Sequence, residues 1–256
     1  MSVGVRETYD ELADHYHLIF ENWQAAIDRQ AGLLAPIVEK ECGPASMVRV
    51  LDCACGIGTQ TLGLAGQGFH MTGCDVSSRA VERARREAAL RSLDIRFAVA
   101  SMLDLASFRD ADFDAVICID NALPHLESPA ELAQAAQQIR NCLRPGGVLM
   151  ASIRDYDRLI KERPATEAPA FYSDHGHRRI VFQVWDWADE HRYTFHLYIT
   201  SELNNRWHTI HTSAAYRALL RDELTGVLGK TGFRNIRWLF PVDTGFYQPI
   251  VLAKAH

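Results

Sequence analysis

Between residues 48 and 155, short apolar runs alternate with longer segments in which apolar residues recur at helical spacing. The longer segments predict helices over residues 59–65, 79–91 and 128–143. Strands alternating with helices are typical of a parallel sheet covered by helices on both faces, with its ligand at the carboxyl ends of the strands. The apolar runs predict five strands, at residues 48–53, 70–74, 95–99, 113–119 and 148–153.

The pattern differs on both sides of this region. The first forty residues have helical spacing, whereas residues 178–187, 192–200 and 207–215 alternate polar and apolar side chains, as antiparallel strands do. A helix at 218–231 and a closing hairpin at 235–240 and 248–253 follow. The predicted fold is a doubly wound, seven-stranded, mostly parallel α/β sheet with an inserted antiparallel lid and an N-terminal helical cover. Its expected segments are a helical cover at 1–44, a ligand-binding core at 45–155, a substrate lid at 156–216, and the last helix and hairpin at 217–256.

Composition narrows the function classes. The chain has 256 residues, 48% of them hydrophobic, and a formal net charge of −5. That charge argues against a general nucleic-acid binder, which needs a basic surface. No apolar segment is long enough to span a membrane, and Met1–Asp10 lacks the features of a signal peptide, so we expect a cytoplasmic protein without membrane partners. The six cysteines lack metal-ligand spacing and are interpreted as buried free thiols, and the scattered histidines suggest no metal site.

The segment Val50–Thr59 contains the sharpest local signal, a glycine-rich turn between a predicted strand and a predicted helix. Its acidic residue Asp52 precedes the turn, and Asp75 ends the next strand, where a carboxylate can bind the two hydroxyls of a ribose. A dinucleotide site would have a third glycine at the position of Thr61. Asp52 would also repel a pyrophosphate, but it could hold an ammonium group. The charge pattern therefore favours S-adenosylmethionine (SAM), which has an ammonium group and no phosphate.

On these motifs the chain resembles the class I SAM-dependent methyltransferases, whose fold is Rossmann-like. The family pattern is Asp/Glu-x-Gly-x-Gly-x-Gly, with Ala54 here replacing the first glycine, and the family often has Asp at the position of Ser101. Residues 113–117 and 143–149 are similar to its fourth and fifth strand motifs. The resemblance covers residues 45–155 and implies that SAM is bound along the turn, at Asp75 and after the third and fourth strands. The implied residues of this core are Asp52, Ala54, Gly56, Gly58, Asp75, Val76, Ser101, Met102, Cys118 and Ile119.

Segments outside the core are similar to one branch, the glycine and sarcosine N-methyltransferases. Tyr9–Phe20 with Trp23 and Arg29 resembles the N-terminal segment of that branch, and Cys118–Leu126 resembles the loop after its fourth strand. The resemblance adds Trp23 and Arg29 to the cofactor-binding residues, with Arg29 pairing with the SAM carboxylate. Arg154–Asp157 is similar to the branch's Arg-Asn-Tyr-Asp, with Asp replacing Asn at the second position. This implies that Arg154 binds the carboxylate of the acceptor.

Chemistry supports the same role for Arg154, because a guanidinium matches a carboxylate with two parallel hydrogen bonds. The alternative is that Arg154 only pairs with Asp155 or Asp157. Methyl transfer to a neutral amine needs little acid–base help, and Tyr9, Tyr16, Asn121 and Tyr156 are candidate walls of the acceptor site. An oxygen acceptor would instead need a base, for which His125 and His15 are available. The alternating aromatic residues Trp185, Trp187, Tyr193 and Phe195 are interpreted as sheet packing.

The sequence thus predicts a SAM-dependent N-methyltransferase that acts on a glycine-like or other carboxylate-bearing small molecule. Two alternatives remain open at this point: a small-molecule O-methyltransferase, and a SAM-binding module without catalysis. The exact acceptor and the number of methyl groups transferred are not determined by the sequence, and a homo-oligomer is compatible with it.

Overall fold

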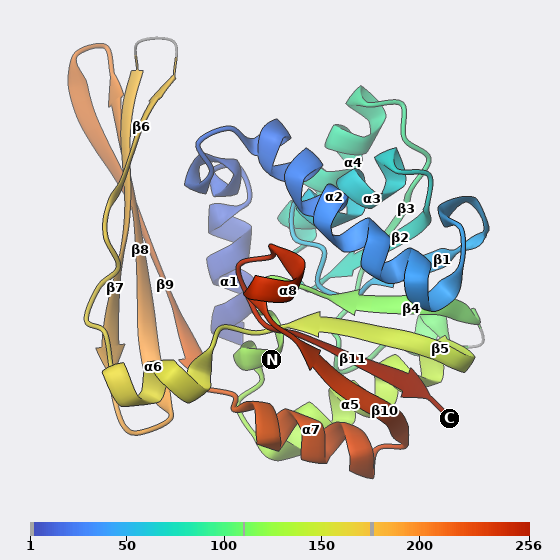
Figure 1. Cartoon of the computed structure of the whole chain (residues 1–256). Helices are drawn as coiled ribbons and strands as arrows, with labels where there is room; N and C mark the ends of the chain where they lie inside the picture. The colour runs from blue at the N-terminus through green and yellow to red at the C-terminus, as the bar shows by residue number, and fades with distance from the viewer. Residues whose placement is uncertain (1–2, 110, 175–176) are drawn as a thin grey trace.

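The computed structural model describes residues 3–109, 111–174 and 177–256, and this part of the chain forms two separate sheets (Figure 1). The larger sheet has seven strands, of which β11 is antiparallel to both of its neighbours and the others are parallel. Strand order reverses at β1, which pairs with β2 on one side and β4 on the other. Across the sheet the strands are β10 (Phe233–Leu239), β11 (Ile250–Ala255), β5 (Leu143–Ser152), β4 (Phe113–Cys118), β1 (Arg49–Asp52), β2 (His70–Asp75) and β3 (Arg96–Val99).

Helices cover both faces of this sheet. On one face Val50 packs with Leu34 of α2, and on the other Leu51 packs with Leu132 of α5, because successive strand residues point to opposite faces. Both faces are therefore buried, which explains why the parallel strands are almost uniformly apolar. One face carries α2 (Trp23–Cys42), α3 (Thr59–Gly66) and α4 (Ser78–Leu90); the other carries α5 (Pro129–Cys142) and α7 (Arg221–Lys230).

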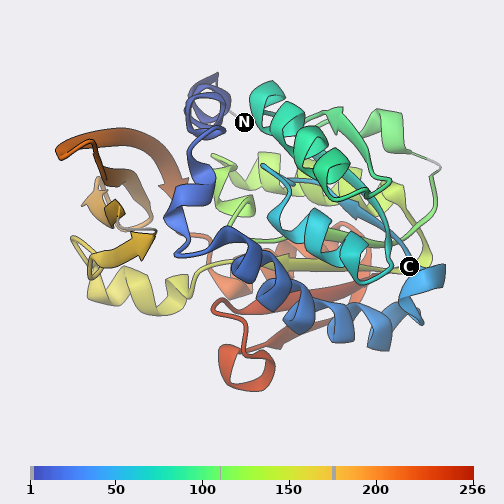
Figure 2. The same ribbon diagram turned by 90° about the horizontal axis from the view of Figure 1, so that it is seen from above.

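The smaller sheet is antiparallel and stands beside the larger one, with α1 (Val3–Leu12) between them at one end of the gap (Figures 1 and 2). Helix α6 (Tyr156–Glu162) connects the end of β5 to this sheet. The short helices are η1 (Tyr16–Ile19), η2 (Ala45–Met47), η3 (Ala106–Phe108), η4 (Leu123–His125) and α8 (Pro241–Thr244). The strands of the smaller sheet are β6 (Ala170–Asp174), β7 (His177–Trp187), β8 (Arg192–Leu203) and β9 (Arg206–Arg217).

The predicted fold class is confirmed, and two caps explain where helices begin. Ser77 accepts a hydrogen bond from the Ala80 amide at α4, and Ser128 accepts one from the Glu131 amide at α5. The sequence pattern predicts neither α6 nor β6, and the helix that it predicts from residue 218 begins three residues later, at Arg221. The division into four segments stays a prediction. In the described ranges no helix combines the length and the apolar character needed to cross a membrane.

Candidate functional site

The glycine-rich turn lies between β1 and α3, at the point where the strand order reverses. Gly56 has φ = +51° and Gly58 has φ = +98°, which is a left-handed backbone that other residues rarely adopt. A side chain at Gly58 would also lie 3.1 Å from the Leu62 side chain on the first turn of α3. The turn therefore requires glycine at Gly58 for both conformation and space.

Asp75 at the end of β2 holds this turn in place. One carboxylate oxygen accepts a hydrogen bond from the Gly56 amide and the other accepts one from the Ser77 amide, both at 2.9 Å. Removal from water raises the pKa of Asp75, whereas these backbone bonds lower it. A carboxylate oxygen can accept more than one hydrogen bond, so Asp75 can still bind a pair of hydroxyl groups.

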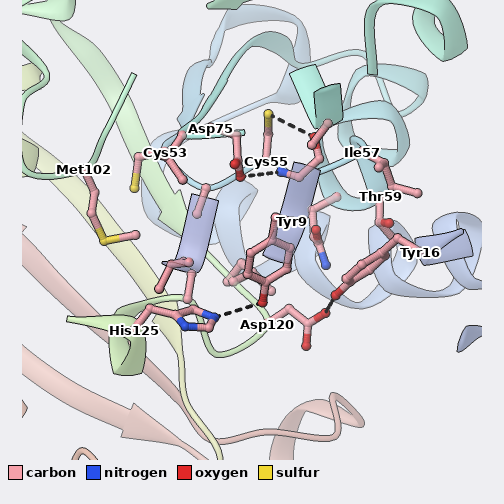
Figure 3. A pocket seen from close by; sticks show the side chains of 18 of the residues that line it. Tyr9, Tyr16, Cys53, Cys55, Ile57, Thr59, Asp75, Met102, Asp120 and His125 are labelled. Carbon is pink, nitrogen blue, oxygen red and sulfur yellow. Dashed lines mark hydrogen bonds between the residues drawn. The ribbon is translucent and has the colours of Figure 1, made fainter. Parts of the chain in front are cut away.

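The turn, β2 and the loops after β3 and β4 surround one cavity, which we call the loop cleft (Figure 3). Its described lining contains Asp75 and Asp120 but neither lysine nor arginine. A phosphate group would meet carboxylates here and no cation, whereas a positively charged nucleoside fits this charge pattern. The lining residues are Val5, Tyr9, Ala13, Tyr16, Cys53, Ala54, Cys55, Gly56, Ile57, Thr59, Gln60, Asp75, Val76, Ala80, Ala100, Met102, Ile119, Asp120, Ala122 and His125.

Asp52 lies one layer below the lining of the loop cleft and is 1% exposed. Its carboxylate accepts a hydrogen bond from the Thr61 hydroxyl at 2.6 Å and one from the Ala54 amide at 3.3 Å. Burial raises the pKa of Asp52 to about 7, and the two hydrogen bonds oppose that change. Asp52 therefore exchanges a proton near neutral pH directly under the turn.

We expect Asp52→Asn to stabilise the ligand-free protein at pH 8 by on the order of 2–4 kcal/mol, at ~1.36 kcal/mol per pKa unit. The folded-state pKa is raised, so the wild-type carboxyl destabilises the fold progressively from about pH 4 to about pH 7. Asparagine does not ionise and so avoids the cost of a buried charge. At pH 4 the carboxyl is protonated, and the two proteins should have nearly equal stability. Urea unfolding at pH 4, 6 and 8 measures the difference. A variant less stable than wild type at pH 8 would show that the ionised carboxylate is stabilised in the fold.

The structure brings together most of the predicted cofactor residues but not all of them. Ala54, Gly56, Asp75, Val76, Met102 and Ile119 line the loop cleft, whereas Asp52, Gly58, Ser101, Cys118 and Trp23 do not. Ser101 hydrogen-bonds the Leu103 amide in its own turn, and Cys118 is fully buried in the core. Trp23 acts on the lining indirectly, because its indole N–H donates to the Thr59 hydroxyl at 2.9 Å. The ligand contacts of these residues stay predictions.

A second cavity of about 510 Å³ lies between the two sheets and is called here the inter-sheet cavity. Its lining comes from α1, η1, the loops after β4 and β5, and the inner face of the smaller sheet. Tyr9, Tyr16 and Asp120 line both cavities and therefore mark their junction. The predicted residues Arg29, Asn121 and Arg154 line the inter-sheet cavity, and a volume of this size is typical of small-molecule sites.

Arg154 faces this cavity without a carboxylate in ion-pair contact, although Glu167 of the same lining acts on its charge from a longer distance. Arg221 of α7 forms ion pairs with both neighbouring acids: its Nη1 lies 2.5 Å from Asp155 Oδ1 and its Nε lies 3.3 Å from Asp157 Oδ2. No carboxylate in the described ranges forms an ion pair with Arg154. The alternative prediction, in which Arg154 only pairs with Asp155 or Asp157, is therefore wrong, because Arg221 neutralises these carboxylates.

Aromatic rings hold the Arg154 guanidinium instead. Its central carbon lies 4.5 Å from the centre of the Trp185 ring and 5.1 Å from that of Phe195, and Nη1 donates to the Tyr193 hydroxyl at 3.2 Å. Such cation–π contacts are worth ~0.5–2 kcal/mol. Trp185, Tyr193 and Phe195 thus do more than pack the sheet, which is all that the sequence analysis assigned to them. Their rings contact a cation that remains available to an anionic ligand.

Asn121 and Tyr156 form the support beneath this site. The Asn121 side chain donates to the Tyr156 hydroxyl at 2.9 Å and accepts from the Arg154 amide at 3.0 Å. The Tyr156 hydroxyl also hydrogen-bonds Tyr193 at 2.9 Å. Tyr156 does not line either cavity, so it orients Arg154 and Tyr193 from behind. The prediction that Tyr156 forms a wall of the acceptor site is therefore wrong, because its side chain lies behind the lining.

Tyr9 and His125 form a hydrogen-bonded pair at the far side of the loop cleft (Figure 3). The Tyr9 hydroxyl lies 2.9 Å from His125 Nε2 and 3.2 Å from the Tyr216 hydroxyl. Burial lowers the pKa of His125 to about 3, and the nearby Arg154 acts in the same direction. His125 is therefore neutral at pH 7, and its Nε2 shares a hydrogen bond with the Tyr9 hydroxyl. The other candidate base, His15, lines neither cavity.

Asp120 lies in the segment Cys118–Leu126, whose resemblance to the N-methyltransferase loop implied no role for it. Asp120 and Asn121 have φ values of +62° and +66°, a conformation that is uncommon outside glycine. The Tyr16 hydroxyl donates to the Asp120 carboxylate at 3.3 Å, and the Tyr247 hydroxyl also donates to it. The sequence does contain one signal for a role of Asp120. It lies just after a central strand that ends where the strand order reverses, and ligands bind at such strand ends.

Comparison with known proteins agrees with these features. Residues 50–147 match the family model described as "Methyltransferase domain". A glycine/sarcosine N-methyltransferase of Parasynechococcus marenigrum is 29% identical over 156 residues, which are 61% of this chain and 54% of that protein. A ubiquinone biosynthesis O-methyltransferase of Xylella fastidiosa is 33% identical over 109 residues, 43% of each protein. The chain thus spans about half the length of the curated relatives it matches.

The fold is similar over a longer stretch. The crystal structure of Streptomyces venezuelae DesVI aligns over 100% of both chains with a TM-score of 0.74 and 18% sequence identity. At that identity the similarity concerns the fold alone. Residues 50–147 thus match a methyltransferase domain, and the glycine-rich turn and the acid that ends β2 agree with the class I SAM-dependent methyltransferases.

Proposed function

We propose that this protein transfers the methyl group of SAM to the amine of a small acceptor that carries a carboxylate. The observation that carries the proposal is Arg154, a guanidinium that faces the inter-sheet cavity among aromatic rings and forms no ion pair in the described structure. A cation that is partly withdrawn from water is costly unless an anion joins it. A carboxylate on the acceptor supplies that anion.

The loop cleft suits the methyl donor. Asp75 is positioned to bind the ribose hydroxyls, and the apolar side chains of Val76 and Met102 can enclose the adenine. Arg29 lines the adjoining cavity, where it can pair with the methionine carboxylate. The acidic lining without lysine or arginine supports a sulfonium nucleoside over a dinucleotide. When bound, SAM supplies a methyl group that is already activated by the positive charge on sulfur.

The residues of this chain then have mainly to orient the acceptor. Arg154 fixes its carboxylate, and Asn121 fixes the Arg154 backbone through the 3.0 Å hydrogen bond. Tyr9 and Tyr16 stand at the junction of the two cavities, where they exclude water from the reacting atoms. In favourable systems such orientation is worth roughly 7–11 kcal/mol of the activation barrier.

Curated relatives include both N- and O-methyltransferases, and His125 favours the amine. A hydroxyl acceptor needs a base whose pKa lies near the working pH. The His125 pKa of about 3 makes it a very weak base, although it is neutral and hydrogen-bonded to Tyr9. An amine acceptor needs no such base once it has lost its proton to solvent.

The test is methyl transfer from SAM labelled in its methyl group. The acceptors are amino acids, the corresponding amines and hydroxy acids, and a reaction without acceptor. We expect label in the amino acids, with at least tenfold less in the amines that lack a carboxylate. Transfer to hydroxy acids alone would support an O-methyltransferase. Tight SAM binding without transfer to any acceptor or cell extract would support a module without catalysis.

A further inference from the structure

The junction of the two cavities contains the carboxylate of Asp120, for which neither SAM binding nor the grip of Arg154 on the acceptor gives a role. Asp120 lines both the loop cleft and the inter-sheet cavity. Its carboxylate accepts hydrogen bonds from the hydroxyls of Tyr16 and Tyr247, and the Gln248 amide lies 3.5 Å away. These donors are all neutral, and no cation in the described ranges forms an ion pair with Asp120. Its negative charge is therefore held in place by neutral donors and has no cation in direct contact.

The backbone around Asp120 is also firmly held. Two consecutive residues with left-handed φ values are unfavourable, and such conformations persist only where the surroundings fix them. The Asp120 amide donates to the Ser152 hydroxyl at 2.8 Å, and the Asn121 amide donates to the Ser152 carbonyl at 3.3 Å. Gln248 in turn accepts from the Ser152 hydroxyl at 2.7 Å. This network fixes the carboxylate at the meeting point of donor and acceptor.

Arg154 supplies the opposite charge in the same cavity. The two groups do not pair with each other, although Asn121 connects their backbones through its bond to the Arg154 amide. A ligand with an ammonium group at one end and a carboxylate at the other would compensate both charges. Such a ligand would place its nitrogen at the junction, next to the methyl donor.

One part of the wall of the inter-sheet cavity is apolar. Leu12, Val181 and Leu197 are buried in one cluster, against which Ile19 and Phe195 pack, and all five line the cavity. With a volume of about 510 Å³ the cavity has room for far more than glycine. An apolar side chain on the acceptor would cover this wall and exclude water from it.

We infer that the acceptor is a zwitterionic amino acid with a sizeable apolar side chain, and that Asp120 binds its amine. This inference rests on the proposed function and names its substrate class. The bound ammonium group first loses a proton to solvent. Asp120 then accepts an N–H hydrogen bond from the resulting neutral amine and so aims the nitrogen lone pair at the methyl carbon. The lone pair forms the new N–C bond, and the electron pair of the breaking C–S bond stays on sulfur. Positive charge moves from sulfur to nitrogen, beside the Asp120 carboxylate, which stabilises it as it develops.

Asp120→Asn tests the role of the charge, because asparagine tolerates the left-handed backbone and keeps a similar shape. We expect kcat/KM for leucine and phenylalanine to fall about 100-fold, as is usual for lost electrostatic stabilisation of a transition state. The dissociation constant of SAM should stay within threefold. Asp222→Asn, which alters an exposed carboxylate outside both cavities, should behave like wild type.

Recognition of the amine is read separately from catalysis, by calorimetry on protein saturated with S-adenosylhomocysteine. Wild type should bind leucine at least tenfold tighter than its 2-hydroxy analogue, and Asp120→Asn should lose that preference. The inference is overturned if Asp120→Asn keeps the preference, if it weakens SAM binding alone, or if wild type favours glycine over leucine. Should wild type methylate no amine, the proposed function fails, while the binding preference still decides the role of Asp120.

Discussion

Asp75→Ala is expected to raise the dissociation constant of SAM about 100-fold. The substitution removes a charged acceptor for two ribose hydroxyls, and hydrogen bonds to charged groups are worth ~1.5–3 kcal/mol each. It also removes the acceptor for the Gly56 and Ser77 amides, both held at 2.9 Å, so the glycine-rich turn loses its anchor. Isothermal titration calorimetry measures the change.

Two further variants separate these contributions. Asp75→Asn keeps one side-chain oxygen and should have an intermediate affinity. Asp94→Ala removes an exposed acid before β3, outside both cavities, and should bind SAM as wild type does. If Asp75→Ala binds SAM within threefold of wild type, Asp75 does not hold the ribose.

Arg154→Met is expected to raise KM for carboxylate-bearing acceptors about 30- to 100-fold. Methionine keeps an apolar body against Trp185 and Phe195 but removes the planar donor pair that a carboxylate needs. For the corresponding amides, which have no negative charge, KM should rise much less. Initial-rate kinetics with each amino acid and its amide measure this selectivity.

Thermal unfolding distinguishes acceptor binding from a structural role. Removing a partly buried cation that forms no ion pair should leave the melting temperature unchanged or higher. Arg158→Met, which alters an exposed guanidinium at the same cavity, is the matched control and should keep the wild-type KM. A large loss of stability in Arg154→Met with unchanged amino-acid-to-amide selectivity would show that Arg154 serves the fold alone.

The loop cleft could be predicted in large part because its chemistry is local in the chain. The turn needs glycine at a left-handed position, and Asp75 is the last residue of its strand. The apolar runs of β1, β2 and β4 place the ends of these strands at one edge of the sheet. Spacing along the sequence was therefore enough to bring the turn and the acid together.

Residues whose position depends on tertiary packing could not be located from the sequence in this way. Nothing in the spacing distinguishes Cys118, which is buried in the core, from Ile119, which lines the cleft. Burial of Asp52 and of Tyr156 likewise depends on which helices and strands pack over them. Short elements such as α6 and β6 escaped prediction because they have too few residues to establish a period.

Sequence alone determined the sheet, the position of its ligand-binding edge and the acidic, phosphate-free character of the donor site, since all three follow from neighbouring residues. Tertiary structure alone decided the acceptor side. It paired Arg221 with the acids beside Arg154, set rings from β7 and β8 around that guanidinium, and held Asp120 at the junction. These contacts join residues 31 to 127 positions apart, and only the tertiary fold brings such distant side chains into one cavity.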